Sequence, residues 1–193
     1  MPAEDRRAER RSLLLDVALE LLGTEGWAGT TVRAICHAAR LNPRYFYESF
    51  DDLDELLVEL YDQLVDELQA AVKVAVKAAV DLDAMVRATV ESTVRFIDED
   101  RRRGRVLYGE ALGNEALNRR RIEAGFAVAD LVASQVDDKI HQLSATIVVG
   151  GFTELLMAWL DGRVKISRRQ LVDDATALFV AVGEAATRIE ASR

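Results

Sequence analysis

The chain has 193 residues, enough for one domain or for a small domain joined to a larger one. Half of its residues are apolar and only two are prolines, which is typical of a helical protein with a substantial core. Its net charge is −8, and its one cysteine excludes an internal disulfide framework.

Neither secretion nor membrane insertion is indicated. The N-terminus, MPAEDRRAERR, lacks the apolar core of a signal peptide. The longest stretch without Asp, Glu, Lys or Arg covers residues 140–153, too short to span a bilayer core of ~30 Å. We therefore expect a soluble, cytoplasmic, all-α protein with no membrane partner.

The first predicted helix begins near residue 4 or 10 and ends at Leu22. Its apolar residues recur at helical spacing and form one inner stripe: Leu14, Val17, Ala18, Leu21 and Leu22. Gly23 and Gly26 are expected to end the helix, since glycine adopts the left-handed geometry of a C-cap. Trp27 would then fill the core of a small three-helix domain.

Residues 30–50, TTVRAICHAARLNPRYFYESF, predict two short helices joined by a tight corner. Thr30 or Thr31 is expected to cap the first helix. Asn42 caps the second, with Pro43 at the first helical position, where its missing N–H costs nothing.

The second of these helices has two contrasting sides. Phe46 and Phe50 lie four residues apart and can share one buried side. Polar and aromatic residues then face outward: Arg44, Tyr45 and Glu48, with Tyr47 and Ser49 at the flanks. Because so short a helix does not persist alone, the preceding helix must brace it. Two short helices, one that supports the other and one that presents polar and aromatic side chains to solvent, form a helix-turn-helix. This motif inserts its second helix into the DNA major groove.

The distribution of charge is compatible with DNA binding. Residues 1–50 carry seven arginines and seven acids, so the acidic excess lies wholly beyond them. Repulsion between the acidic part and phosphates is damped beyond a Debye length of ~8 Å. We therefore expect weak non-specific affinity for DNA, and most of the acids serve only to keep the protein soluble. The arginines at 6, 7, 10 and 11 either anchor on a DNA backbone or form a solvated tail.

Residues 53–193 predict six further helices. Asp52-x-x-Glu55 resembles a capping box, and the helix after it continues through Val80. The next begins at Asp81 or Asp83, and the arginine run 101–105 interrupts the pattern. The remaining helices are expected at about 106–112, 114–136 and 141–160, and after a capping box at Ser167.

These features together resemble the tetracycline-repressor (TetR) family of bacterial transcription regulators. The resemblance runs through LLLDVALELLGTEGWAGTTVRAICHAARLNPRYFYESFDDLDELL, and it also includes the C-terminal GGFTELLMAWLDGRVKISRRQLVDDATALFV. It implies a helix-turn-helix domain at residues 1–52 and a helical effector-binding and dimerisation domain at 53–193, with about nine helices in all.

The resemblance also implies roles for single residues. Thr31 and Tyr47 match positions that contact phosphates, and Arg44 and Tyr45 match positions that reach base edges. The full set expected at DNA is Thr31, Arg33, Asn42, Pro43, Arg44, Tyr45, Tyr47 and Ser49. The chain departs from the family pattern at three positions: Arg44 replaces a common glycine, Ser49 a common histidine, and Leu53 a lysine that contacts phosphate.

The family's usual mode is a homodimer that binds an inverted-repeat operator on double-stranded DNA and releases it when a small-molecule effector binds. The expected dimer contacts lie on the last two helices: Ile147, Gly150, Gly151, Leu155, Trp159, Leu178, Phe179 and Val182. The expected pocket for the unidentified effector is lined by Met85, Phe96, Tyr108, Glu110, Phe126, Phe152 and Glu154.

Two other classes of function stay open at this point. The chain could be an all-helical small-molecule enzyme or carrier, or an adaptor that buries the aromatic face of its third helix against a partner protein. The sequence contains no visible constellation of base, nucleophile or metal ligands, so we expect no enzyme, metal or cofactor. Cys36 lies on the inner stripe of its helix and is expected to act as a small packed hydrophobe.

Overall fold

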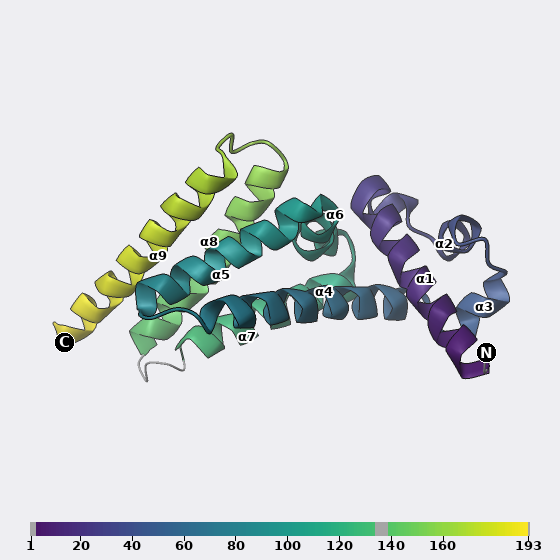
Figure 1. Ribbon diagram of the computed structural model, residues 1–193, viewed down its shortest axis with the longest axis horizontal. Helices are drawn as coiled ribbons and strands as arrows, with labels where there is room; N and C mark the ends of the chain where they lie inside the picture. Colours follow the sequence, from purple (N-terminus) through teal and green to yellow (C-terminus); the bar gives the residue numbers. More distant parts are fainter. Residues whose placement is uncertain (1–2, 134–138, 193) are drawn as a thin grey trace. The chain divides into compact units, whose positions relative to one another are not determined.

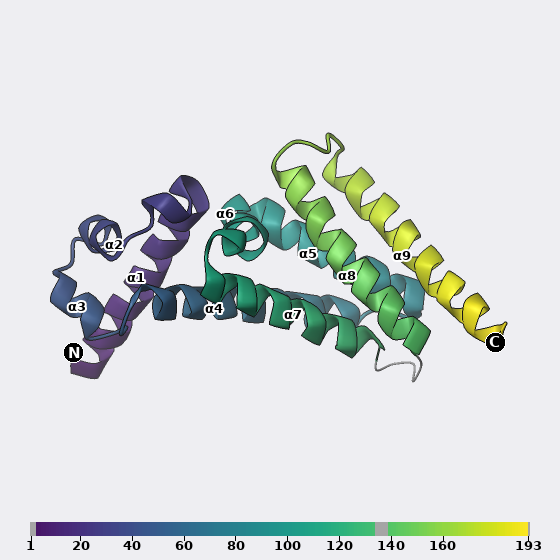
Figure 2. The same ribbon diagram turned by 180° about the vertical axis from the view of Figure 1, so that it is seen from behind.

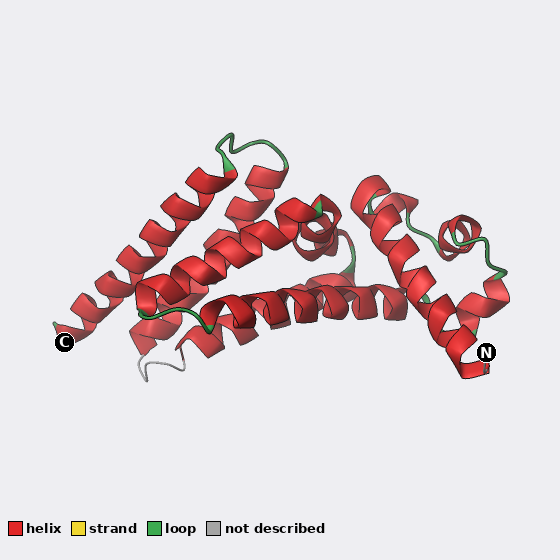
Figure 3. Cartoon of the chain, in the orientation of Figure 1, coloured by secondary structure: helices red, strands yellow, loops and turns green. Residues whose placement is uncertain are grey.

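The computed structural model describes residues 3–133 and 139–192, and within these ranges all regular structure is helical (Figures 1 and 3). The prediction of an all-α fold is confirmed. The α-helices in the described ranges are α1 (Ala3–Glu25), α2 (Val32–Ala38), α3 (Pro43–Tyr47), α4 (Leu53–Val76), α5 (Leu82–Glu99), α6 (Arg101–Gly104), α7 (Glu115–Ala133), α8 (Lys139–Leu160) and α9 (Arg168–Ala191).

The described residues also contain three short turns of other helical types. A 3-10 turn, η1 (Trp27–Gly29), follows α1. A π-helical turn, η2 (Arg105–Gly109), and a second 3-10 turn, η3 (Glu110–Gly113), follow α6. Residues 101–113 are therefore helical throughout but change their winding twice.

Side-chain caps set several helix boundaries. Thr31, not Thr30, caps α2 by accepting a hydrogen bond from the Ala34 N–H at 3.1 Å. Ser167 caps α9 by accepting from the Gln170 N–H at 3.2 Å, as predicted. Asp100 accepts from the Arg102 N–H and starts α6 inside the arginine run, where the sequence predicted an interruption. The cap outweighs the crowding of positive charge at this helix start, and the negative charge of Asp100 also suits the positive N-terminal end of the helix dipole.

Other predicted boundaries need correction. Helix α1 continues through Gly23 and ends before Gly26, whose φ of 75° is the left-handed turn. Helix α4 ends at Val76, so the residues up to Val80 are not helical. The predicted end of the seventh helix at residue 136 lies outside the described residues.

The chain forms two compact units. The first contains residues 1–66 and 100–120, and the second contains residues 67–99 and 121–193. Helix α4 continues from one unit into the other. The expected boundary between a DNA-binding domain and an effector-binding domain, at residues 52 and 53, stays a prediction.

In the first unit, α1 is the central element. It packs against α2, α3 and η1, and also against α6 and η2. Its inner face is buried at Leu14, Ala18 and Leu22. Trp27 does not fill the three-helix core: it is half-buried, next to Gly113, and its backbone N–H donates to a Glu110 carboxylate oxygen at 2.8 Å.

In the second unit, α9 packs against both α5 and α8, and α8 and α9 run antiparallel (Figures 1 and 2). An ion pair between Arg87 and Asp173 joins α5 to α9. The rings of Phe152 and Phe179 meet edge to face, with their centroids 5.2 Å apart.

Helix α8 contains a segment, Gln142–Leu160, that is long and apolar enough by length and composition to cross a membrane, with a mean hydropathy of 1.6. The sequence prediction considered only uncharged runs, and this segment is longer because it includes a charged residue. Glu154 is the one charged residue in this segment.

Candidate nucleic-acid interface

The corner between α2 and α3 is a complete Schellman motif. The Leu41 N–H donates to the Cys36 carbonyl at 2.9 Å, and the Arg40 N–H donates to the His37 carbonyl at 3.1 Å. This arrangement requires a left-handed residue after the helix, and Arg40 provides it with a φ of 54°. Asn42 then caps α3 by accepting from the Arg44 N–H at 2.9 Å, with Pro43 at the first helical position, as predicted.

Helix α3 has the two sides that its sequence predicted. Phe46 and Phe50 are buried, with ring centroids 5.7 Å apart. On the other side, the Arg44 side chain is 82% exposed, and Tyr45 and Tyr47 are 38% and 60% exposed. An anchored helix thus presents one guanidinium and two phenol groups to solvent.

Two arginines of α1 hold α3 in place. The Arg11 guanidinium donates to the Ser49 carbonyl and to the Glu59 carboxylate of α4, and it lies 4.1 Å from the centre of the Phe50 ring. The Arg10 guanidinium lies 4.6 Å from the centre of the Tyr45 ring. Both guanidinium groups therefore make contacts within the protein, so Arg10 and Arg11 are not a solvated tail, and an additional contact with a DNA backbone stays a prediction. Sequence spacing could not pair residues nearly 40 positions apart.

Ser49 is a correction to the predicted DNA-binding set. It is only 6% exposed, and its hydroxyl oxygen is buried without a hydrogen-bond partner among the described residues. Its position at the end of α3 turns the side chain inward beside Phe50. The hydroxyl cannot reach a phosphate or a base from there.

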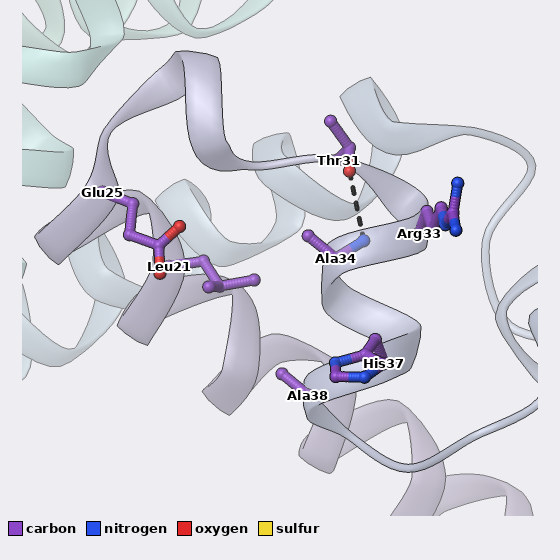
Figure 4. A pocket seen from close by; sticks show the side chains of 7 residues that line it. All are labelled: Leu21, Glu25, Thr31, Arg33, Ala34, His37 and Ala38. Atoms are coloured by element: carbon purple, nitrogen blue, oxygen red, sulfur yellow. Dashed lines mark hydrogen bonds between the residues drawn. The ribbon is translucent and has the colours of Figure 1, made fainter.

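The start of α2 borders an open depression of about 450 Å³ (Figure 4). Thr31 and Arg33 lie on its rim and are exposed, as a contact with a nucleic-acid backbone requires. His37 from the next turn also lines it. The contact of Thr31 and Arg33 with DNA stays a prediction.

Cys36 lies on the buried side of α2, and burial raises the pKa of its thiol. A thiol with a raised pKa is a poor nucleophile. Among the described residues, no group of three or more His, Cys, Asp and Glu side chains is placed to hold a metal ion.

The predicted effector-pocket residues do not share one environment. Met85, Phe126 and Glu154 are exposed, so the expectation that they lie on an interior wall is wrong for the single chain. The carboxylate of Glu110 is occupied by the Trp27 N–H.

The other predicted pocket residues are more enclosed. Phe96 is buried, and Phe152 is half-buried against Phe179. Tyr108 lies on the π-helical turn, and burial raises the pKa of its hydroxyl above the ordinary value. Tyr108 and Glu110 belong to the first compact unit, and the remaining five residues belong to the second.

The predicted dimer residues are mostly accessible. Ile147 on α8 and Leu178 on α9 are 68% and 60% exposed, and Gly150 and Gly151 on α8 are exposed as well. Leu155, Phe179 and Val182 are half-buried. Trp159 is the exception, because it is 7% exposed and its indole N–H donates to the Ile166 carbonyl at 3.0 Å. It stabilises the loop between α8 and α9 and exposes little surface to a second copy.

Comparison with known proteins agrees with this geometry. Residues 14–60 match the family model described as bacterial regulatory proteins, tetR family. No curated protein matches the chain.

Many solved structures share the fold, including these three. A putative transcriptional regulator from Pseudomonas aeruginosa PAO1 is 20% identical, with a TM-score of 0.75 over 97% of this chain and 95% of that one. A putative TetR-family regulator from Syntrophomonas wolfei is 14% identical, with a TM-score of 0.77 over 91% and 95%. The multidrug binding protein EbrR, complexed with imidazole, is 20% identical, with a TM-score of 0.67 over 88% and 94%.

The family match covers the helix-turn-helix, and the structural matches extend over nearly the whole chain. Residues 14–60, which contain α2 and α3, are thus similar to the bacterial regulatory proteins of the tetR family, and the chain as a whole shares the fold of these solved structures.

Proposed function

We propose that this protein is a cytoplasmic, ligand-responsive repressor that binds an inverted-repeat operator as a homodimer and releases it when a small molecule binds. The observation that carries the DNA-binding part is α3, whose buried phenylalanines fix a helix that presents Arg44, Tyr45 and Tyr47 to solvent. Helix-turn-helix dimers place two such helices in successive major grooves, ~34–36 Å apart, and for this reason their operators are inverted repeats.

The dimer is supported by the exposed apolar side of α8 and α9. Ile147 and Leu178 expose large apolar side chains, and Gly150 and Gly151 offer a stretch of α8 without Cβ atoms. A symmetric dimer covers the same patch on both subunits, and glycines allow the backbones to approach closely. We infer that a second copy, and not a lipid bilayer, covers the apolar face of α8.

The proposal that a small molecule binds is supported by analogy with EbrR, a structural neighbour described as a multidrug binding protein. We place the effector and dimer functions in residues 53–193 and the DNA-binding function in residues 1–52. A ligand can release DNA only by binding the DNA-incompetent form more tightly, typically with a coupling of ~1–3 kcal/mol. A thermal-shift screen against a library of small molecules would identify ligands that raise the melting temperature.

Mobility shift of the duplex upstream of the chain's own gene, measured at two salt concentrations, tests DNA binding. A regulator that neutralises several phosphates loses affinity steeply as salt rises. A carrier or an adaptor would shift no duplex even at low salt, and that result would reject the proposal.

The Arg44→Ala variant tests the role of α3 more closely. We expect it to weaken operator binding by ~1–3 kcal/mol and to relax one base preference in each half-site, because arginine donates bidentately to guanine. Titrations of wild type and variant against duplexes changed at single positions measure both effects. Full affinity with unchanged selectivity would show that Arg44 does not read the groove.

A further inference from the structure

The C-cap residue of α3 is a half-buried acid, Glu48, that DNA binding alone does not explain. A carboxylate on a helix that approaches phosphates is repelled by them, so a neutral side chain would favour affinity. Both Glu48 oxygens are paired with arginines: one accepts from the Arg44 Nε at 3.0 Å, and the other lies 3.6 Å from an Arg10 terminal nitrogen. One carboxylate thus joins the displayed arginine to the arginine that braces the helix.

Arg10 extends this arrangement to Tyr45. Its guanidinium lies 4.6 Å from the centre of the Tyr45 ring, and its side chain is 25% exposed. Arg10, Arg44, Tyr45 and Glu48 form one group, which we call the Glu48 cluster. The cluster contains Arg44 and Tyr45, the two α3 residues expected to contact base edges, and Arg10 connects it to α1.

The pairing geometry favours one way of reading a base. Glu48 holds Arg44 through Nε, which leaves the two terminal NH₂ groups free on a side chain that is 82% exposed. Two parallel N–H donors match the O6 and N7 acceptors of guanine. The same carboxylate partly neutralises Arg10 and Arg44, which weakens their attraction to phosphates of any sequence.

We propose that Glu48 is a positioning residue that sets DNA specificity: it directs Arg44 toward a guanine and keeps Arg10 and Arg44 from binding phosphates indiscriminately. This inference rests on the proposed DNA-binding function of α3. It adds that an acid on the recognition helix lowers affinity for non-operator DNA and raises discrimination between sequences.

The test compares the wild type with Glu48→Gln, Glu48→Asp, Arg44→Ala and the double variant Glu48→Gln/Arg44→Ala, all as full chains. The probes are a randomised duplex library, from which bound sequences are selected and counted, and sonicated non-operator DNA titrated at several salt concentrations. Glu99→Gln is the matched control, because Arg95 Nε lies 4.0 Å from the Glu99 carboxylate in a pair with the same spacing on α5. Circular dichroism verifies that each variant folds.

We expect Glu48→Gln to reduce the preference at one base per half-site by about three- to tenfold, since part of a bidentate contact is lost. Affinity for non-operator DNA should rise, with a salt dependence steeper by about one phosphate contact. Glu48→Asp keeps the charge but is too short to hold Arg44, so it should lose the preference while non-operator affinity stays low. In the Arg44→Ala background, Glu48→Gln should cause no further loss of base preference. Glu99→Gln should have the same base preference and the same affinity for non-operator DNA as the wild type.

An unchanged preference in Glu48→Gln would overturn the inference. An equal loss in the Arg44→Ala background would also overturn it, because Glu48 would then act through the stability of α3 and not through Arg44. If the wild type selects no sequence from the library, the DNA-binding function fails, and that outcome is distinct from the other two.

Discussion

Arg40 is the residue at which this chain departs most clearly from local backbone preference. It occupies the left-handed position of the Schellman motif between α2 and α3, with a φ of 54°. Glycine is the usual residue at such a position, since an L side chain clashes with the backbone there. The corner that aims the recognition helix therefore carries strain at a single residue.

Replacing this residue should stabilise the protein. We expect Arg40→Gly to raise the free energy of unfolding by ~0.5–1 kcal/mol, because the relief of the left-handed strain exceeds the added chain entropy. Urea unfolding followed by circular dichroism measures the change. Arg33→Gly, at an exposed position inside α2, is the control and should instead destabilise by ~1 kcal/mol. Loss of stability in Arg40→Gly would show that the arginine itself holds the corner.

At the scale of single residues, the sequence predicted the features that depend on residues nearby in the chain. The caps at Thr31 and Asn42 and the burial of Phe46 and Phe50 follow from local spacing, and each is present. The inward turn of Ser49 and the pairing of Arg11 with Glu59 depend on which helices meet. The spacing of residues within one helix does not show which other helices it contacts.

At the scale of elements, the segment from α6 to η3 is the part that the sequence described least well. An arginine run looks like an interruption, yet Asp100 caps α6, and hydrogen bonding to Arg102 holds the pKa of Asp100 below its usual range. Arg102 also pairs with Glu20, and Arg105 donates to the Gly23 carbonyl at 3.1 Å. Contacts with α1, distant in sequence, thus determine how this segment winds.

Gly23 is the point of closest approach between α1 and α6. A Cβ built there would lie 2.5 Å from the Arg102 Cβ and 2.9 Å from its Cα. Alanine favours a helix over glycine, but we expect Gly23→Ala to destabilise by ~1–3 kcal/mol because backbone must move to admit the methyl group. Thermal or urea unfolding measures the effect.

The control for this substitution is Gly125→Ala on α7, where nothing lies within 4 Å of the added Cβ. It should stabilise by ~0.5–1 kcal/mol through helix propensity alone. Equal stabilisation by both substitutions would contradict the close packing of α1 on α6.

At the scale of the whole molecule, the chain leaves its most apolar helix largely uncovered. The Gln142–Leu160 segment has a mean hydropathy of 1.6, yet only 17% of it is buried in the single chain. Uncovered apolar surface of this kind is costly in water, so the proposed homodimer would bury it. The sequence predicts this helix as an interface through its glycine pair, but it could not show that the Trp159 indole bonds to the loop that follows.

Ile147→Glu tests this assignment. Its side chain is 68% exposed, so the subunit should fold normally. A carboxylate buried in a symmetric interface without a partner should weaken the dimer by at least ~2 kcal/mol. Sedimentation equilibrium should show monomers for this variant and dimers for the control Val80→Glu, at a position 91% exposed and outside the proposed interface. A dimer unchanged by Ile147→Glu would locate the interface elsewhere.

The central claim is that two copies of α3 lie in successive major grooves of one duplex. Methylation interference at guanine N7, an atom exposed only in the major groove, measures this directly on a duplex selected by the protein. We predict two clusters of interfering guanines related by two-fold symmetry, with centres ~10 base pairs apart or a multiple of that spacing, and loss of interference at one guanine per half-site in Arg44→Ala. Binding that tolerates methylation at every guanine, or interference confined to a single cluster, would contradict the account.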